Sequence, residues 1–198
     1  MSTRTGVLLL VSGPSGSGKT TLCRRLAQDG EAHYSISCTT REAREGEVNA
    51  RDYYFLSREE FEAEAGVGHF IEHAEVHGNL YGTLKSAVIE FLQRGDDVVI
   101  DIDVQGADQV RACEDPLVNA SLVDLFVMPA SEEDLRERLA NRATDTEDVI
   151  SLRLSNALEE MSHAGRYTYQ LISGSKDDDY TRCRSLLVAE RLRVSRFR

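Results

Sequence analysis

Residues 7–22 constrain the fold of this chain more than any other segment. Apolar residues 7–11 are few, mostly branched, and followed by small polar residues, which is typical of a strand buried on both faces. The pattern G-x-x-x-x-G-K-[ST] follows at once, complete from Gly13 to Thr20, with a helical pattern behind it. A strand, a glycine-rich loop and a helix in this order predict a site for a nucleoside triphosphate.

Each residue type in this loop has a chemical use. Glycines let the backbone turn several N–H groups toward phosphate oxygens, and the following helix presents the positive end of its dipole. Lys19 adds positive charge for the outer phosphates, and the Thr20 hydroxyl is a ligand for Mg²⁺. The residues expected to bind the triphosphate are Gly13, Pro14, Ser15, Gly16, Ser17, Gly18, Lys19, Thr20 and Thr21.

The charge of the chain limits its partners. Its 198 residues include 34 acidic and 23 basic side chains, which gives a formal net charge of −11. Such a chain is unsuited to general nucleic-acid binding or to an anionic membrane surface, so we expect neither partner. Arginines that gather locally in so acidic a chain are expected to serve a local anion.

Cysteine usage and the N-terminal residues indicate a cytoplasmic protein. The four cysteines show no C-x-x-C spacing, which favours free thiols over a disulfide framework or a zinc site. Cys38 is the best candidate for a reactive thiol, although a small core residue is the preferred interpretation. The sequence shows no signal-peptide pattern and no apolar run near the ~20 residues of a membrane span.

Strand patterns alternate with helical patterns, which predicts an α/β fold of the P-loop NTPase type. The expected architecture is a mostly parallel sheet covered by helices on both faces, interrupted by an inserted substrate subdomain within residues 33–85. Strands are expected at residues 7–11, 33–37, 53–56, 69–77, 98–102, 122–128 and 169–172. Helices are expected at residues 19–29, from 57, 84–94, 104–113, 131–142, 149–164 and 177–193, with a loop at 38–52 and a turn at 78–82.

Asp101 ends the strand pattern at residues 98–102, in the position of a Walker-B acid. Such an acid lies beside the phosphate loop and holds Mg²⁺, usually through water. The alternative is a solvated strand end, but the strand follows the loop by one crossover, which favours the functional interpretation. We therefore expect Mg²⁺ at Thr20 and Asp101.

Two arginines in the polar loop predict a second phosphate site. Arg41 and Arg44 are three residues apart and can converge on one anion as charge-assisted donors. Tyr53 and Tyr81 are candidates for additional hydroxyl donors. Arg51 is a further candidate in the same loop, although we prefer a solvated position for it. A solvated position is also the alternative interpretation for Arg41 and Arg44.

Three more arginines flank the polar residues 143–148 and resemble a closing lid. Arg138 and Arg142 lie four apart on one helix face, and Arg153 lies on the next helix. Phosphoryl transfer needs positioning and positive charge around the transferred group, which such a lid supplies. For Arg138, an ordinary surface pair with acidic neighbours is an almost equal alternative. The arginines after the last helix are expected only to complement its dipole: Arg191, Arg193, Arg196 and Arg198.

Glu72 lies in a strand pattern with three histidines at a spacing of four. We interpret His69, His73 and His77 as one half-exposed strand face and reject a metal site, because no further ligand is evident. Glu72 is expected on the opposite face with Phe70. A carboxylate there can accept the N1–H and N2–H₂ donors of guanine.

Five motifs in order resemble the guanylate kinase family, from about residue 7 to 189. They are SGPSGSGKTTL, SCTTREAREGEVNARDYYF, FIEHAEVHGNLYGT, DIDVQGA and RATDTED. The resemblance implies a guanine pocket of Ser37, Glu72, Thr83 and Asp103, and a GMP-phosphate clamp of Arg41, Arg44, Tyr53 and Tyr81. It also implies that Lys19, Arg44, Arg142 and Arg153 act on the transferred phosphate, with Arg138 contributing to ATP binding.

The implied activity is transfer of the ATP γ-phosphate to GMP, and to dGMP, with Mg²⁺, for purine nucleotide metabolism and GTP supply. The implied organisation is a single domain with a core of residues 1–36, 86–128 and 163–198. Residues 37–85 form the GMP-binding subdomain and residues 129–162 the lid. The chain departs from the family pattern at Ala143, at Glu42-Ala43, and at Ser173-Gly174-Ser175, which replaces an Asn-Asp.

Two other classes of function compete with this one. A binding module with the same fold would lack the catalytic charges, yet Lys19, Asp101, Arg44 and Arg142 are all present. A kinase acting on a ribose bisphosphate would not need Glu72 and Asp103 to select a base. Both residues are present, which favours GMP as the acceptor.

Overall fold

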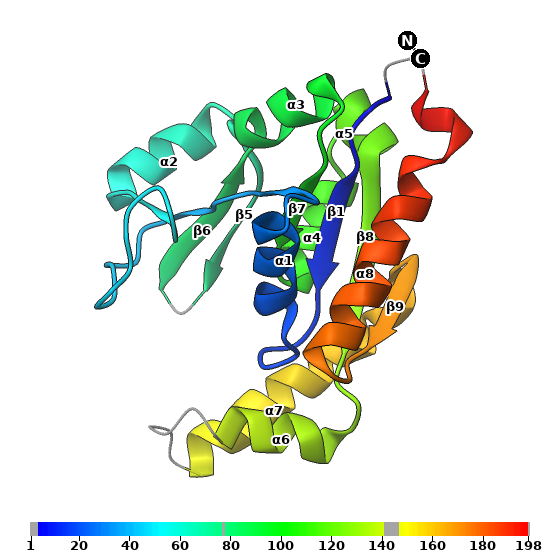
Figure 1. Cartoon of the computed structure of the whole chain (residues 1–198). Helices are drawn as coiled ribbons and strands as arrows, with labels where there is room; N and C mark the ends of the chain where they lie inside the picture. The colour runs from blue at the N-terminus through cyan, green and yellow to red at the C-terminus, as the bar shows by residue number, and fades with distance from the viewer. Residues whose placement is uncertain (1–3, 77, 141–146, 198) are drawn as a thin grey trace.

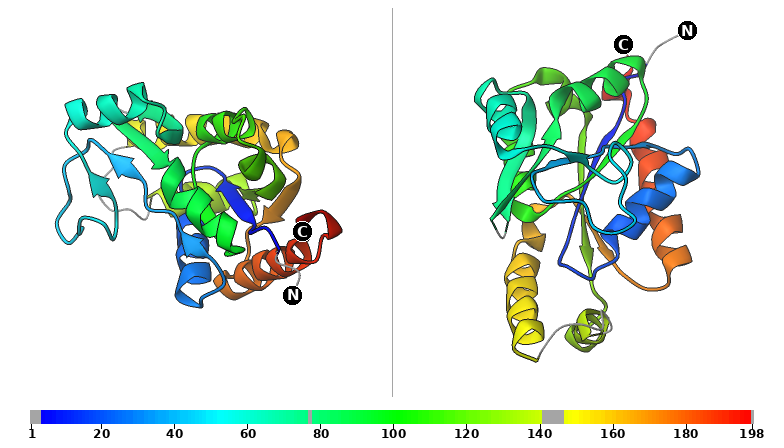
Figure 2. Two further views of the ribbon diagram at one scale, coloured as in Figure 1. Left: turned by 90° about the horizontal axis from the view of Figure 1, so that it is seen from above. Right: turned by 90° about the vertical axis from the view of Figure 1, so that its left-hand side faces the viewer.

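A computed structural model of the chain describes residues 4–76, 78–140 and 147–197. Two sheets organise these residues, and helices cover the larger one on both faces (Figures 1 and 2). The larger sheet is parallel throughout and has the order β2-β7-β1-β8-β9. Its strands are β1 (Leu8–Ser12), β2 (His33–Tyr34), β7 (Val98–Asp101), β8 (Leu122–Met128) and β9 (Tyr169–Ile172). The predicted α/β fold is confirmed.

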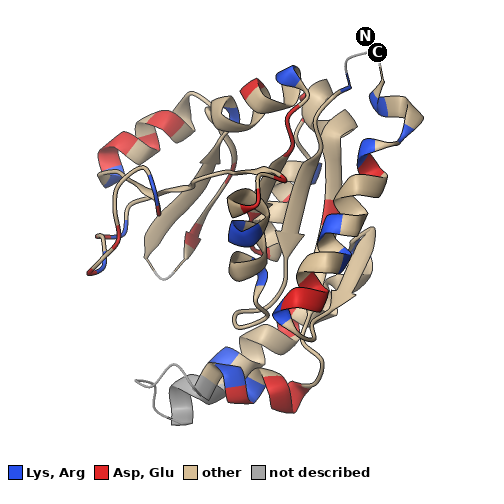
Figure 3. Cartoon of the chain, viewed as in Figure 1, with Lys and Arg blue, Asp and Glu red and all other residues tan. Residues whose placement is uncertain are grey.

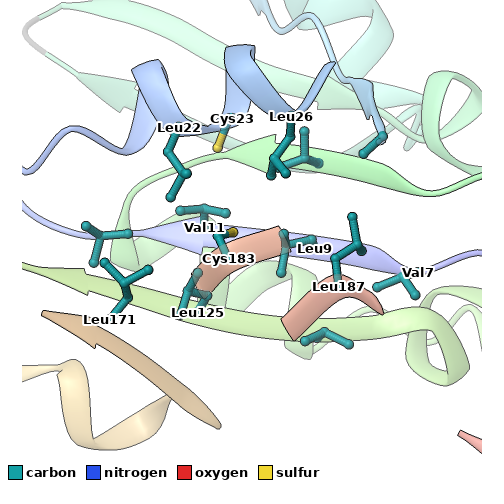
Figure 4. Close-up of a cluster of buried hydrophobic side chains, with 14 residues drawn as sticks. Val7, Leu9, Val11, Leu22, Cys23, Leu26, Leu125, Leu171, Cys183 and Leu187 are labelled. Atoms are coloured by element: carbon teal, nitrogen blue, oxygen red, sulfur yellow. The ribbon is translucent and has the colours of Figure 1, made fainter. Parts of the chain in front are cut away.

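The strand before the phosphate loop is the centre of this sheet. Leu8 pairs with Val98 on one side and with Leu122 on the other, and every residue of β1 is buried. Alternate side chains enter two core clusters on opposite faces, Leu9 in one and Leu8 in the other. Figure 4 shows the first cluster, which α1 (Lys19–Gln28) and α8 (Lys176–Arg191) cover.

The opposite face is covered by helices that follow the predicted positions, with one addition. They are α3 (Lys85–Arg94), α4 (Val104–Arg111) and α5 (Pro116–Ser121). The sequence analysis does not predict α5, although the residues at its start are typical of a helix N-terminus. Asp115 caps it by accepting from the N–H groups of Leu117 and Val118, and Pro116 occupies the first helical position.

The inserted segment forms a smaller sheet of its own, with the order β4-β3-β6-β5. Its elements are β3 (Cys38–Thr39), β4 (Tyr54–Phe55), α2 (Arg58–Gly66), β5 (Phe70–Val76) and β6 (Asn79–Leu84). The buried members of its core are only Cys38, Phe61 and Phe70. Burial raises the pKa of the Cys38 thiol to about 11, which fits a core residue and not a reactive one. The predicted capping box of Ser57 and Glu60 at α2 is confirmed.

Two expectations for this segment are wrong. Residues 38–52 are not wholly loop, because Cys38 and Thr39 pair with both β4 and β6. Residues 78–82 are not a turn, because strand β6 begins at Asn79. Of the two glycines in residues 78–82, Gly78 alone has the positive φ of a turn glycine (φ 80°). Gly82 is needed for packing, since a Cβ there would lie 2.9 Å from the Phe70 ring and 3.0 Å from Phe61.

Two helices extend from the carboxyl end of the large sheet (Figure 1). They are α6 (Glu132–Ala140) and α7 (Glu147–Ser162), which pack together through Leu135, Leu139 and Ala157. Ser131 caps α6 as predicted, its hydroxyl accepting from the Asp134 N–H at 3.1 Å. A short 3₁₀ turn, η1 (Ala164–Arg166), links α7 to β9.

The C-terminal arginines do more than complement a helix dipole. Arg196, in η2 (Val194–Arg196), is 2% exposed and pairs with buried Glu190 at 3.1 Å. Its guanidinium also donates to the carbonyl groups of Ala120 and Ser121, at the end of α5. Arg191 pairs with Asp97 and Glu31, whereas Arg198 lies outside the described residues. Our expectation was therefore wrong for Arg196, because its buried guanidinium joins the end of α5 to Glu190 of α8.

Within the described residues, no helix combines the length and the apolar character needed to span a membrane.

Candidate functional site

The phosphate loop joins the carboxyl end of β1 to the first turn of α1 (Figure 1). Gly13, Gly16 and Gly18 all have positive φ, and Gly18 is the N-cap of the helix. A side chain at Gly13 would collide with the carbonyl oxygen of Val127 on the neighbouring strand β8. The glycines therefore allow a tight loop whose N–H groups surround an anion at a helix N-terminus.

The three charged or polar residues predicted beside the loop come together. Lys19 Nζ donates to the Pro14 carbonyl oxygen across the loop at 3.4 Å. The Thr20 hydroxyl donates to the carboxylate of Asp101, which stands at the end of β7 next to β1. Burial raises the pKa of Asp101, while Lys19 and the Thr20 hydroxyl oppose that shift. Thr20 and Asp101 thus form the oxygen pair predicted from the sequence.

A cavity of about 680 Å³ opens beside the loop on the side of α8. Arg138 lines it, pairs with Asp134 at 2.9 Å, and donates to the Ser173 hydroxyl at 3.3 Å. Arg138 thus has the acidic partner of the surface-pair interpretation and also lines the cavity, and its part in ATP binding stays a prediction. At Ser173-Gly174, where the chain departs from the family pattern, Asp179 accepts from the Ser173 hydroxyl and the Gly174 N–H, both at 2.8 Å. Sequence reasoning missed Asp179.

The predicted phosphate clamp gathers around a carboxylate that sequence reasoning missed. Arg41 donates to both oxygens of Glu47, at 2.9 and 3.0 Å, and the Arg44 N–H donates to Glu47 at 2.7 Å. The guanidinium of Arg41 lies 5.4 Å from the centre of the Tyr53 ring, and that ring meets Tyr81 edge-on at 6.1 Å. The sequence does contain a hint of this contact, because Glu47 follows Arg44 at the same spacing of three that separates Arg41 from Arg44.

The exposed Arg44 side chain is on the same loop, as is that of Arg51, which is 64% exposed. Arg51 pairs with Asp52 at 2.8 Å and donates to the Gly46 carbonyl at 2.9 Å. This agrees with the preferred interpretation, which gave Arg51 no phosphate to bind.

Three of the residues expected to form the guanine pocket face one another between the small sheet and α4. Glu72 on β5 is 5% exposed and pairs in register with Thr83 on β6. A Cβ at Gly106 would lie 2.9 Å from its carboxylate, so this glycine of α4 makes room for it. Asp103, the N-cap of α4, accepts from the Gly106 N–H at 2.8 Å.

Burial raises the pKa of Glu72 to about 7, with a hydrogen bond from Thr83 opposing the shift and Asp103 adding to it. Our expectation that Glu72 shares a face with Phe70 was wrong. The pairing of β5 with β6 shifts between Phe70 and Glu72, as in a β-bulge. The ring of Phe70 consequently stacks on Phe61 in the small core, and Glu72 turns to α4.

The histidines of this strand do not gather. His69 contacts Glu64 at 2.6 Å, the ring of His73 lies 6.3 Å from that of Phe61, and His77 lies outside the described residues. In the part of the chain that the structure describes, no three His, Cys, Asp or Glu side chains are placed to hold a metal ion together.

Residues on α7 complete the surroundings of the loop. Arg153 lies on this helix, whereas Arg142 lies outside the described residues. Glu160, also on α7, was missed by sequence reasoning. Burial raises its pKa, Lys19 opposes that shift, and Asp103 adds to it, so this carboxyl stands within electrostatic reach of both predicted sites.

A second cavity, of about 220 Å³, connects the two predicted sites. Lys19, Thr20 and Asp101 line it from the phosphate loop and the large sheet. Ser37, Tyr53 and Asp103 line it from the opposite side, where the acceptor site was predicted. The structure thus opens both sites onto one space.

Comparison with known proteins identifies the family. The family model described as "Guanylate kinase" matches residues 5–190. The chain belongs to the guanylate kinase family. A guanylate kinase of Cereibacter sphaeroides is 44% identical over 194 residues, which are 98% of this chain and 90% of that protein. One of Clostridium tetani is 39% identical over 193 residues, with the same coverage.

A solved structure agrees with this assignment. The crystal structure of guanylate kinase from Anaplasma phagocytophilum superposes with a TM-score of 0.81 at 32% sequence identity. The match covers 99% of this chain and 92% of that one. Its similarity therefore extends to both sheets and to the described parts of the helical pair α6 and α7.

Proposed function

We propose that this guanylate kinase family member transfers the γ-phosphoryl group of ATP to GMP, and to dGMP, giving ADP and GDP or dGDP. The observation that carries the proposal is the shared cavity, because Lys19 of the phosphate loop and Tyr53 of the predicted clamp line one space. Direct transfer between two nucleotides requires that both phosphates reach such a space at the same time.

The residues divide into a donor side and an acceptor side. On the donor side, residues 13–21 and Arg138 hold ATP, with Lys19 on its outer phosphates. On the acceptor side, Glu72 accepts from the guanine edge, and its partners are Ser37, Thr83 and Asp103. The GMP phosphate binds the clamp, which consists of Arg41, Arg44, Tyr53 and Tyr81.

In the free protein, the Glu47 carboxylate occupies the place on Arg41 that the GMP phosphate is proposed to take. This carboxylate holds Arg41 through two oxygens, as a phosphate would, and thereby keeps the guanidinium in place in the free protein. Entry of GMP exchanges one anion for another on Arg41, so the clamp is preorganised. Arg44, whose side chain is exposed, is then available for the transferred group together with Arg142 and Arg153 from the lid.

The oxygen pair at the loop suits Mg²⁺. The Thr20 hydroxyl and the buried Asp101 carboxylate are hard oxygen ligands, and their hydrogen bond shows that they already point at each other. Thr20 and Asp101 would hold the ion there, and it would supply positive charge to the donor phosphates. The attacking phosphate oxygen is already an anion, so the reaction needs no general base. The remaining positive charge around the transferred group comes from the lysine and arginine side chains of the site.

We further propose that the chain is one domain with three parts. The core comprises residues 1–36, 86–128 and 163–198, the GMP-binding subdomain residues 37–85, and the lid residues 129–162. The two smaller parts close over the core and exclude water, which limits hydrolysis of ATP without transfer.

A coupled assay of ADP release tests the proposal. We expect release that depends on GMP or dGMP and is much slower with AMP or with ribose phosphates. Release with a ribose phosphate but not with GMP would identify a sugar-phosphate kinase instead. Absence of release with every acceptor, despite binding of ATP, would leave a binding module of this fold.

A further inference from the structure

One ion pair joins the helix of the phosphate loop to the acceptor subdomain. Arg24 lies one helical turn after Thr20 on α1, and its guanidinium is 3.2 Å from a carboxylate oxygen of Asp52. Asp52 directly precedes Tyr53 of the clamp. Both residues line the shared cavity, so the pair spans the space in which the two substrates are proposed to meet.

Asp52 is a well-anchored partner for this contact. Its side chain is 11% exposed, and its other oxygen accepts from the Val48 N–H at 3.0 Å and from Arg51 Nε at 3.0 Å. The side chain of Arg24 is 47% exposed by contrast. The Asp52 carboxylate is therefore held in place by its own loop, and the longer, more exposed side chain of Arg24 extends from α1 to contact it.

The small sheet has a second tether at its opposite edge. Gln109 of α4 exchanges two hydrogen bonds with the backbone of His73 on β5, at 3.0 and 2.8 Å. Strand β5 is one edge of this sheet and β4, which follows Tyr53, is the other. The hydrogen bonds of Gln109 thus fix the edge of the sheet that carries Glu72. The ion pair of Arg24 fixes the opposite edge, next to Tyr53 of the clamp.

We propose that Arg24 is a positioning residue for the acceptor phosphate. Through Asp52, it holds the loop of the clamp against α1, so that Tyr53 faces Lys19 across the shared cavity. This inference rests on the proposed function, because it concerns the GMP site of that reaction. It assigns Arg24 no contact with the guanine base, which is selected at the other edge.

Three variants isolate the role of Arg24. Arg24→Met removes the charge that crosses between the two parts, Arg24→Lys retains it, and Arg51→Met is the matched control. Arg51 pairs with the same carboxylate from within the loop. Steady-state kinetics give kcat and KM for GMP and ATP, calorimetry gives the affinity for GMP alone, and a thermal melt verifies folding.

We expect Arg24→Met to raise the KM and the Kd for GMP about two- to fivefold, the range of a partly exposed ion pair. The KM for ATP and the preference for GMP over AMP should remain unchanged. Arg24→Lys should restore most of the affinity, and Arg51→Met should stay within about twofold of the wild type.

Three results would overturn the inference. They are an unchanged KM for GMP in Arg24→Met, equal losses in Arg24→Met and Arg51→Met, and a fall in kcat with both KM values unchanged. The last would place Arg24 on the transferred phosphate itself. A wild-type protein without GMP-dependent ADP release would instead overturn the proposed function, so the two failures are distinguishable.

Discussion

The two anion sites of this protein are built in opposite ways. The phosphate loop uses backbone N–H groups held by a completely buried strand at the centre of the large sheet. The clamp uses long arginine side chains on a loop of the small sheet, whose buried core has three members. The first site is rigid because the core fixes its backbone. The second depends on a partner carboxylate, Glu47, to hold Arg41 before the substrate arrives.

The largest expected effect concerns the charge at the rigid site. Lys19→Met should lower kcat by about 10³-fold, because no other side chain of the loop supplies positive charge to the transferred phosphate. Single-turnover kinetics measure this loss. Lys85→Met, at the first position of α3, is the matched control and should keep full activity. Near-normal turnover in Lys19→Met would contradict the role given to the loop lysine.

The difference in core size can be tested by a cavity in the small core. Phe61 is 1% exposed and stacks on Phe70, so Phe61→Ala should lower the local free energy of unfolding by about 3 kcal/mol. Hydrogen exchange should then rise throughout residues 37–85 while binding of an ATP analogue persists. Equal loss of protection in β1 and β8 would show instead that the two sheets unfold as one unit.

At the acceptor site, Glu72→Gln should weaken GMP binding about 100-fold at pH 8, where the carboxylate is mostly ionised, since the charged acceptor for the guanine edge is lost. Calorimetry with GMP measures the change. Glu75→Gln, on the same strand and paired with exposed Arg58, is the control and should bind GMP normally. Undiminished selectivity for GMP over AMP in Glu72→Gln would contradict the assignment of Glu72 to the base.

The raised pKa of Glu72 also predicts a pH dependence. In the unfolded chain this carboxyl ionises near its ordinary pKa of 4.5, whereas in the folded chain it holds its proton to about pH 7. The folded state binds more protons in this interval, so stability falls as pH rises through it, by on the order of 3 kcal/mol. Glu72→Gln should therefore be more stable than the wild type at pH 8 and equally stable near pH 4.5. Denaturant unfolding at both values measures the difference.

The same contrast explains what the sequence predicts and what it does not. Residues 7–20 form a local pattern, and the strand, the loop and the start of the helix appear where that pattern places them. Asp101 was also recognisable, because it follows a buried strand that pairs with β1. These features depend on neighbours in sequence or on one crossover.

The acceptor site depends on partners that no local pattern reveals. Gly82 resembles a turn residue, and only its pairing with Cys38 and His73 shows that it belongs to a strand. The β-bulge that separates Phe70 from Glu72 depends on pairing with β6, and the Arg24–Asp52 pair joins different elements. Arg196 was misjudged for the same reason, since its carbonyl partners at Ala120 and Ser121 lie far along the chain.

The central position of β1 has a consequence for how the protein is made. Leu8 is synthesised before both of its partners, Val98 and Leu122. The apolar residues 7–11 therefore lack these neighbours until the chain has been extended as far as Leu122. Pairing over such distances in sequence is slow and leaves hydrophobic strands open to aggregation. The strand that gives the phosphate loop its rigidity is therefore open to misassembly throughout the synthesis of residues 13–121.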